Sequence, residues 1–436
     1  MNQIADTAPR PARTRTLSLE GFLRSQLLRR LEGLQHGQLV LVEGDTEQVF
    51  GSVDTRPDAL QVRVEVLDPA FYRAVAANGS VGAGEAWMDG LWRSDDLVGL
   101  IQLLVRNRGL VDGMETGMAR LGGIAMRAWH ALRRNTRDGS RRNIAAHYDL
   151  GNDFFSLFLS PDLMYSSALW AGTDDTLEHA SHRKLERICA QLELRSGDRV
   201  VEIGTGWGGF ALHAARHYGC HVTTTTISRE QHALATARVA EAGLTDRVTL
   251  LLQDYRDLEG HYDKLVSIEM VEAIGAPYLD TYFDRLGSLL KPEGLAMVQA
   301  ITIEDHRYQQ ALESVDFIKR HVFPGSFIPS INALLAAKTR ASDLAVIDLH
   351  DFGHSYALTL QTWRDRFMAK LPQVRAQGFD ERFIRMWEFY LAYCEGGFRE
   401  RAIGVAHLLL AKPGYRRSRP GAVVGPPATS AGQGGA

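Results

Sequence analysis

Seven short apolar runs, most of them separated by helical stretches, constrain the fold of this 436-residue chain more than any other feature. They are DRVVEIGTG (198–206), CHVTTTTIS (220–228), RVTLLLQD (247–254), DKLVSIEM (263–270), GLAMVQAIT (294–302), LAVIDLHDFG (344–353) and AHLLLAKP (406–413). Each run has the length and composition of a strand. Strands that alternate with helices form a doubly wound α/β sheet, which binds ligands at the carboxyl ends of its strands. The sequence therefore predicts such a domain over residues 144–415.

A smaller unit with helices and strands precedes this domain, over residues 15–126. A helix is expected from Leu17 to Leu34, and QLVLVEG (38–44) and LQVRVEVLD (60–68) alternate like strands. The apolar run SDDLVGLIQLLVRN (94–107) predicts a further helix, with Ser94 as its N-cap. Two domains also agree with the length of the chain, because single cores seldom grow to this size.

The segment between the two units is strongly basic. RAWHALRRNTRDGSRRN (127–143) contains six arginines. Such a segment either rests on an anionic lipid surface or serves as a solvated linker, and the sequence leaves both interpretations open. Residues 1–14 and 416–436 are rich in polar residues, proline or glycine, and we expect them to be disordered.

Charge, cysteine content and hydropathy exclude several classes of protein. The net charge of −3 does not favour a nucleic-acid partner. The three cysteines have neither disulfide-framework nor metal-ligand spacing, so no metal site is expected. No apolar run reaches the roughly 18–20 residues of a spanning helix, and the N-terminus has no secretory signal. We therefore expect a cytoplasmic protein that meets a membrane only at its inner surface.

The first strand of the large domain is followed by a glycine-rich turn and a helix. Gly204, Gly206 and Gly209 form a G-x-G-x-x-G pattern, which lets a backbone approach an anionic ligand closely. A dinucleotide would require an acidic residue at the end of the second strand, about 20 residues later. The run HVTTTTIS contains none, and the next acidic residue is Glu230. The sequence thus argues against NAD.

S-adenosylmethionine is the other common ligand of such a turn. Its methionine carboxylate would lie over the glycines, and its adenine would contact the loop after the third strand, where Asp254 can accept a hydrogen bond. Asp254 can also simply begin the loop. Glu202, which precedes the turn, is a further candidate cofactor-binding residue, although a strand glutamate can instead cap backbone amides.

Several segments resemble the cyclopropane fatty-acyl-phospholipid synthase family of S-adenosylmethionine-dependent methyltransferases, which is related to the mycolic acid cyclopropane synthases. They are RRNIAAHYDLGNDFFSLFLSPDLMYSSALW, VEIGTGWGG, TISREQ, EMVEAIG, HVFPGSFIPS and FGHSYALTLQTWRDRF, in the order of the family and within residues 70–415. The resemblance implies an α/β fold with the Rossmann-like, seven-stranded sheet of class I methyltransferases and a smaller α+β N-terminal domain that associates with lipid. It also leaves room for a homodimer.

The resemblance assigns roles to individual residues. Cofactor binding falls to Tyr165, Ser166, Gly204, Gly206, Thr226, Gln231 and Asp254. The family also holds a bicarbonate ion beside the reacting carbons, and the matching residues here are Glu272, Tyr356 and the backbone of Ile301. Ser167, Gln299 and Ala273 stand where the family usually has cysteine, histidine and histidine, which leaves the fate of the proton open. Ser167 and Gln299 keep hydrogen-bonding capacity, so an anion could still bind.

The implied reaction transfers a methyl group to a double bond in an unsaturated phospholipid acyl chain. Proton loss from the new methyl closes a cyclopropane ring, whereas loss from a neighbouring chain carbon leaves a methylene branch, as in enzymes linked to tuberculostearic acid. An apolar insertion near residues 304–340 is expected to face the lipid. Six rings are candidates to shield a carbocation: Phe154, Phe155, Tyr165, Trp170, Tyr356 and Trp363. A methyltransferase for a soluble small molecule and a non-enzymatic lipid-binding module are the alternatives.

Overall fold

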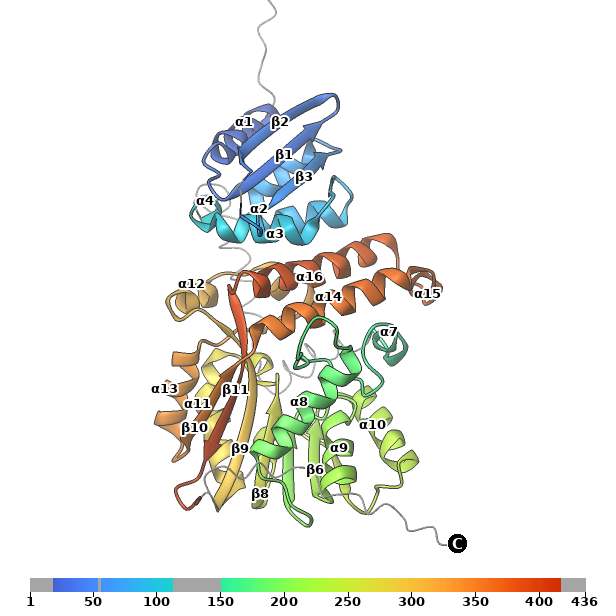
Figure 1. The fold of residues 1–436 in the computed structure, drawn as a ribbon, viewed down its shortest axis with the longest axis vertical. Coiled ribbons are helices and arrows are strands. Elements are labelled where there is room, and N and C mark those ends of the chain that lie inside the picture. The colour runs from blue at the N-terminus through green and yellow to red at the C-terminus, as the bar shows by residue number, and fades with distance from the viewer. Residues whose placement is uncertain (1–18, 54–55, 113–149, 417–436) are drawn as a thin grey trace, which may run out of the picture.

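The computed structural model describes residues 19–53, 56–112 and 150–416. They form a small N-terminal domain and a larger methyltransferase-like domain, shown in blue and in green to red in Figure 1. The basic segment 127–143 and the predicted disordered tails 1–14 and 417–436 lie outside the described residues, so those expectations stay predictions.

The N-terminal domain packs helices against a four-stranded sheet with strand order β2-β1-β3-β4. Its elements are α1 (Leu19–Leu31), β1 (Gly37–Glu43), β2 (Thr46–Ser52), β3 (Gln61–Val66), α2 (Ala70–Met88), β4 (Trp92–Ser94), α3 (Leu97–Arg106) and α4 (Arg108–Asp112). The expected helix and both expected strands are present. The predicted N-cap is wrong, because Ser94 ends β4 and Asp96 caps α3 by accepting a hydrogen bond from the Gly99 N–H.

All seven predicted strands are present and form one sheet of order β10-β11-β9-β8-β5-β6-β7. They are β5 (Arg199–Ile203), β6 (His221–Thr226), β7 (Val248–Leu252), β8 (Tyr262–Ile268), β9 (Leu290–Ile303), β10 (Ala345–Asp351) and β11 (Ile403–Ala411). Strands β5 to β9 run parallel, and β11 pairs antiparallel with both β9 and β10. The sheet is therefore mixed, with its reversed strand near one edge.

Helices cover both faces of this sheet. One face packs against α8 (Leu177–Gln191), α9 (Gly209–Tyr218) and α10 (Arg229–Glu241). The other packs against α11 (Leu279–Leu289) and α13 (Ile331–Ala341). The two apolar cores that result hold the parallel strands rigidly, so that the loops at their carboxyl ends have fixed positions.

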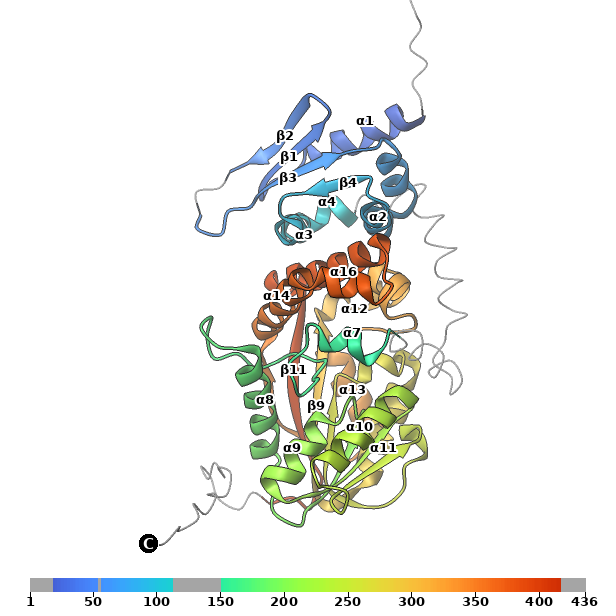
Figure 2. The same cartoon turned by 90° about the vertical axis from the view of Figure 1, so that its right-hand side faces the viewer.

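A helical layer lies between the sheet and the N-terminal domain, as Figures 1 and 2 show. It consists mainly of α14 (Gly353–Ala369) and α16 (Glu381–Arg399), accompanied by the short helices α7 (Asn152–Ser156), α12 (Tyr308–Glu313) and α15 (Leu371–Ala376). Helix α16 packs on α14 on one side and on α2 and α3 on the other. A single hydrophobic cluster thus runs from the N-terminal sheet into the large domain.

Specific contacts fix the two domains against each other. The Trp87 indole N–H donates to the Arg385 carbonyl at 3.1 Å, and Arg106 forms an ion pair with Glu400. At Gly84 the backbone of α2 approaches the Phe317 ring so closely that an added Cβ would lie 2.4 Å from it. The interface between the domains is therefore close-packed.

Candidate active site

The glycine turn lies at the carboxyl end of β5, in the middle of the sheet. Gly204 has φ of +100°, a backbone conformation that other residues rarely adopt. Gly209 begins α9 directly against Met164, whose sulfur would lie 2.4 Å from an added Cβ. The predicted strand, turn and helix are confirmed. Backbone conformation requires glycine at Gly204, and close packing against Met164 requires it at Gly209.

Glu202, just before the turn, is buried in the sheet and accepts a hydrogen bond from the Thr224 hydroxyl at 2.6 Å. Burial raises the pKa of Glu202 to about 8. This hydrogen bond comes from a side chain rather than a backbone amide, and a protonated Glu202 can donate to a ligand in the cavity that it lines.

The residues expected near the ribose and adenine meet at the ends of β6 and β7. The Thr226 hydroxyl donates to Gln231 Oε1 at 2.8 Å, and both side chains are buried. Asp254 is also buried, and its two oxygens accept hydrogen bonds from the Arg256 guanidinium at 2.8 and 2.6 Å. The arginine was not foreseen, and it orients the carboxylate that the sequence singled out.

Tyr165 and Ser166 reach the cavity from the loop before α8. The Ser166 hydroxyl accepts a hydrogen bond from the Lys184 ammonium at 2.7 Å. Lys184 is fully buried, and burial lowers its pKa to about 8, against the influence of the Glu269 and Asp162 carboxylates. No local pattern singles out this lysine, because a single Lys on an amphipathic helix normally points to solvent.

One cavity of about 670 Å³ unites these residues. All eight predicted cofactor-binding residues line it, from Tyr165 to Asp254, together with Glu272, Ile301 and Tyr356. It continues between the domains to apolar side chains of the N-terminal sheet and helices, among them Leu41, Val64 and Ile101. The cavity therefore has a polar end at the glycine turn and a long apolar end.

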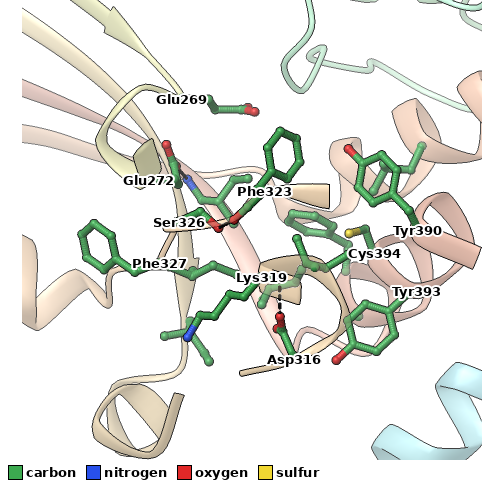
Figure 3. A pocket seen from close by; sticks show the side chains of 18 of the residues that line it. Glu269, Glu272, Asp316, Lys319, Phe323, Ser326, Phe327, Tyr390, Tyr393 and Cys394 are labelled. Carbon is green, nitrogen blue, oxygen red and sulfur yellow. Dashed lines mark hydrogen bonds between the residues drawn. The ribbon is translucent and has the colours of Figure 1, made fainter. Parts of the chain in front are cut away.

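Glu269, which the sequence analysis did not select, also lines this cavity. Its Oε1 accepts hydrogen bonds from the Ser167 backbone N–H at 2.9 Å and from Gln299 Nε2 at 2.7 Å. Its Oε2 accepts one from the Tyr356 hydroxyl at 2.7 Å. The backbone φ of Glu269 is +49°, which is rare for a residue with a side chain. Residues with such a strained backbone are often found at functional sites. Figure 3 shows Glu269 and Glu272 with the pocket wall around them.

Glu272, the predicted catalytic carboxylate, has different neighbours. Its Oε1 accepts a hydrogen bond from the Ile301 N–H at 2.5 Å, whereas its buried Oε2 has no hydrogen-bond partner among the residues that the structure describes. Burial, reinforced by the charge of Glu269, raises the pKa of Glu272 to about 8. At neutral pH Glu272 therefore carries a proton, and Oε2 can donate it into the cavity.

Bicarbonate does not fit this arrangement of donors. Tyr356 and Gln299 donate to Glu269, and the Ile301 N–H donates to Glu272. The Ser167 hydroxyl turns away and donates to the Ala168 carbonyl. Of the predicted anion ligands, only Glu272 Oε2 remains available. Tyr356 donates to the Glu269 carboxylate in this structure, and the expectation that it shares an ion with Glu272 stays a prediction.

Gln299 and His407 form a buried chain of hydrogen bonds that supports Glu269. Gln299 donates to Glu269 through its amide nitrogen, while its oxygen lies 2.9 Å from His407 Nε2. His407 must then donate from Nε2, and burial lowers its pKa, so the ring is neutral. Burial raises the pKa of Glu269 above its usual range, and hydrogen bonds from Tyr356, Ser167 and Gln299 oppose that shift. Glu269 is thus a positioned and unusually basic carboxylate.

The predictions for the candidate rings and for the insertion are only partly correct. Tyr165 and Tyr356 line the cavity, but Phe154, Phe155, Trp170 and Trp363 do not, and all of these except Trp170 are buried in the core. Rings that the sequence did not select line it instead, including Trp207, Phe323, Tyr390 and Phe398. The insertion contributes several wall residues between Gln310 and Ile328, whereas α13 packs against α11.

The fold and site together define a class of protein. A seven-stranded mixed sheet, a glycine turn after its first strand and a cavity at the strand ends are those of a class I S-adenosylmethionine-dependent methyltransferase. Residues 135–408 match the family model described as mycolic acid cyclopropane synthetase, and the chain belongs to this family.

Individual relatives agree with this assignment. The chain is 37% identical over 412 residues to a tuberculostearic acid methyltransferase of Mycobacterium tuberculosis, covering 90% of this chain and 91% of that protein. It is 38% identical over 342 residues to the cyclopropane-fatty-acyl-phospholipid synthase of Escherichia coli strain K12, covering 78% and 85%. A crystal structure of a mycolic acid cyclopropane synthase complexed with SAH and CTAB superposes with a TM-score of 0.58 at 28% identity, covering 62% of this chain and 98% of that chain.

Within residues 19–53, 56–112 and 150–416, no helix is both long enough and apolar enough to cross a bilayer.

Proposed function

We propose that the protein methylates the double bond of an unsaturated acyl chain in membrane phospholipid and that Glu269 removes the proton that completes the reaction. The observation that carries this proposal is that Glu269, held by three hydrogen bonds, lines a cavity that also reaches the glycine turn and the apolar side chains of the N-terminal domain. A methyl donor at the glycine turn and a hydrocarbon chain in the apolar end would meet beside this carboxylate. The two relatives are named a tuberculostearic acid methyltransferase and a cyclopropane-fatty-acyl-phospholipid synthase, which supports an acyl-chain substrate.

S-adenosylmethionine, when bound, supplies an electrophilic methyl group on its sulfonium sulfur. The glycine turn, Thr226, Gln231 and Asp254 would hold it, and Tyr165 and Ser166 lie near the cavity centre. An isolated alkene is a poor nucleophile, so alignment by the protein must supply much of the acceleration.

The acyl chain would lie against the aliphatic and aromatic side chains of the apolar end. Each buried CH₂ contributes about 0.8 kcal/mol, which favours long chains over short ones. Addition of the methyl group to one olefinic carbon leaves a cation on the other carbon. Phe323, Tyr390 and Tyr165 line the cavity, and their ring faces and the exclusion of water would protect this cation.

Glu269 would then take a proton from the cationic acyl chain. When the new methyl group loses it, the C–H electron pair forms the third bond of a cyclopropane ring and the proton passes to a Glu269 oxygen. Tyr356, Gln299 and the Ser167 N–H position this carboxylate. No exogenous base is needed, since the protein's own carboxylate holds the place expected for bicarbonate.

A branched product is the second candidate, and a specific observation favours it. The base here is fixed to the backbone, and its surroundings at Ser167, Gln299 and Ala273 depart from the pattern expected of ring-forming relatives. A base in a different position can remove a different proton, which leaves a double bond and a branch. The relative that matches over 90% of this chain is named a tuberculostearic acid methyltransferase.

The decisive experiment incubates the protein with S-adenosylmethionine and vesicles of monounsaturated phosphatidylglycerol. Mass spectrometry should find acyl chains heavier by one CH₂, and proton NMR should distinguish ring protons from vinylic protons. A methyltransferase for soluble small molecules would leave the vesicles unmodified, although it would still bind S-adenosylhomocysteine. A lipid-binding module without activity would bind vesicles but not S-adenosylhomocysteine.

Contact with an anionic membrane surface follows from a substrate that resides in the bilayer. Leu19 and Phe22 of α1 are 61% and 50% exposed, and Arg29 and Arg30 lie in the last turn of the same helix. Exposed apolar side chains beside arginines suit an anionic lipid surface. Flotation with vesicles should decrease for Phe22→Ser, and unchanged flotation would contradict this role of α1. A homodimer and a cytoplasmic location stay predictions.

A further inference from the structure

Three histidines from two neighbouring helices converge on the surface of the methyltransferase domain, outside the cavity. His182 lies on α8, and His213 and His217 lie on α9. One nitrogen atom from each of the three rings lies within 4.8 Å of the nitrogen atoms from the other two. His213 and His217 are four residues apart on one helix face, which is a spacing that directs two imidazoles to one ligand.

The ring positions match those of a metal site. The ring centroids of His182 and His213 are 5.0 Å apart, those of His213 and His217 are 4.7 Å apart, and those of His182 and His217 are 6.0 Å apart. Three imidazoles bound to tetrahedral Zn²⁺ through Zn–N bonds of about 2.0–2.1 Å have ring centres about 5 Å apart. The unliganded geometry is therefore close to the liganded one.

Glu186 supplies an oxygen at the same point. Its Oε1 lies 2.8 Å from His213 Nε2 and 3.8 Å from His182 Nε2. The Tyr218 hydroxyl donates to the other oxygen, Oε2, at 2.7 Å and so orients the carboxylate. An outer hydrogen bond of this kind is typical of carboxylates that bind metals.

The buried histidine of the group lacks a satisfactory partner. His213 is 7% exposed, and its Nε2 makes no hydrogen bond even though Glu186 is near. The other two histidines are exposed, so a cation can enter from solvent.

We propose that His182, Glu186, His213 and His217 form a binding site for a divalent transition-metal cation of the Zn²⁺ class, which ties α8 to α9. Imidazole and carboxylate ligands in a four-coordinate arrangement suit Zn²⁺ and Co²⁺. Helix α9 follows the glycine turn, and Lys184 of α8 donates to Ser166, which lines the cavity, so the cation joins two helices that each reach the cavity through one neighbouring segment. This site does not depend on the proposed reaction.

The test uses full-length protein without a histidine tag, freed of metal by a chelator and titrated with Co²⁺. The expected result is one equivalent of Co²⁺ with the intense visible absorption of four-coordinate cobalt, displaced by Zn²⁺. His182→Gln and His217→Gln should each weaken Co²⁺ binding by more than the roughly 10-fold that loss of an outer partner costs. The matched control is His179→Gln, which changes an exposed histidine on α8 outside the cluster and should bind like the wild type.

The substitutions lie at exposed rings, so the variants should keep the circular dichroism spectrum of the wild type. Zn²⁺ should raise the melting temperature of the wild type and of His179→Gln, but not that of the doubly substituted His182→Gln, His217→Gln protein. Equal Co²⁺ binding by the double variant and the wild type would place the cation elsewhere and overturn the proposal. Absence of four-coordinate absorption in the wild type would overturn it as well.

Discussion

The glycine turn and the Glu269 cluster face the same cavity, but they are built in different ways. The turn is continuous in sequence, from β5 through Gly204 to the first residue of α9. The cluster consists of Glu269 and its donors Ser167, Gln299 and Tyr356, which lie 102, 30 and 87 residues away from it along the chain. The first site depends on local backbone conformation, whereas the second exists only when distant strands and helices have packed. Substitutions in the two sites should therefore fail differently.

The largest effect is expected at the cluster. Glu269→Gln should lower turnover by about 10²- to 10⁴-fold, the usual contribution of a positioned general base. S-adenosylhomocysteine binding, measured by calorimetry, should stay within a factor of a few of the wild type, because the glycine turn is unchanged. Turnover above half of the wild-type value would remove Glu269 from the reaction. Glu269→Asp serves as the companion variant, since it keeps the charge but shifts the oxygens and should recover only part of the activity.

The next effect is expected at the turn. Gly204→Val forces a β-branched residue to φ of +100° and places its Cβ 3.2 Å from Met270. Strain of about 1–3 kcal/mol should open the turn and weaken S-adenosylhomocysteine binding by roughly 10- to 100-fold. Gly243→Val is the control, because Gly243 also has positive φ but has open space around it. If both variants bound the ligand equally well, the turn would not be the cofactor site.

A smaller effect is expected in the apolar end of the cavity. Ala83 of α2 lines it, so Ala83→Leu should displace part of a long acyl chain. Loss of one or two buried CH₂ groups costs about 0.8–1.6 kcal/mol, which corresponds to a roughly 4- to 15-fold lower kcat/KM. Shorter chains should be affected less. Ala77→Leu, on the same helix but not lining the cavity, is the control, and an equal loss for all chain lengths would argue against this path.

The smallest effect concerns pH and stability. The pKa of Glu272 is raised to about 8, so the folded protein holds a proton that the unfolded chain releases near pH 4.5. The stability that this bound proton gives to the folded protein is lost as pH rises from about 5 through 8. The unfolded chain is ionised over this range, whereas the folded protein must form a buried charge to lose its proton. Glu272→Gln removes that cost, so its melting temperature should gain on the wild type by a few degrees between pH 6 and pH 9. A constant difference across this range would contradict the raised pKa.

The positions of the cofactor residues could be predicted because local signals reported them. Strand-like runs of the correct length, a glycine pattern and an acid at the end of the third strand place Gly204 and Asp254 at one edge of the sheet. The parallel topology then makes neighbours of residues that follow neighbouring strands. The resemblance added Tyr165, Ser166, Thr226 and Gln231, which have no comparable local signal.

The carboxylate that we propose as the base could not be identified in the same way. EMVE contains two glutamates three residues apart, and the sequence analysis assigned a role only to Glu272. One weak signal pointed to Glu269: it follows a buried strand directly, so its side chain was not expected to be exposed to solvent. Which glutamate faces Tyr356 depends on the left-handed backbone of Glu269, a feature that propensity does not reveal. Lys184 and His407 were missed because their burial is a property of the assembled core.

The amino-acid sequence by itself determined the class of fold, the strand succession and the turn that receives the cofactor. These depend on hydrophobic periodicity and on glycine conformations, which are properties of short segments. Only the tertiary structure decided which carboxylate receives the donors, which rings line the cavity and that histidines from two helices meet. Those outcomes depend on the packing of segments far apart in the chain, and burial there changes the charge and proton affinity of each group.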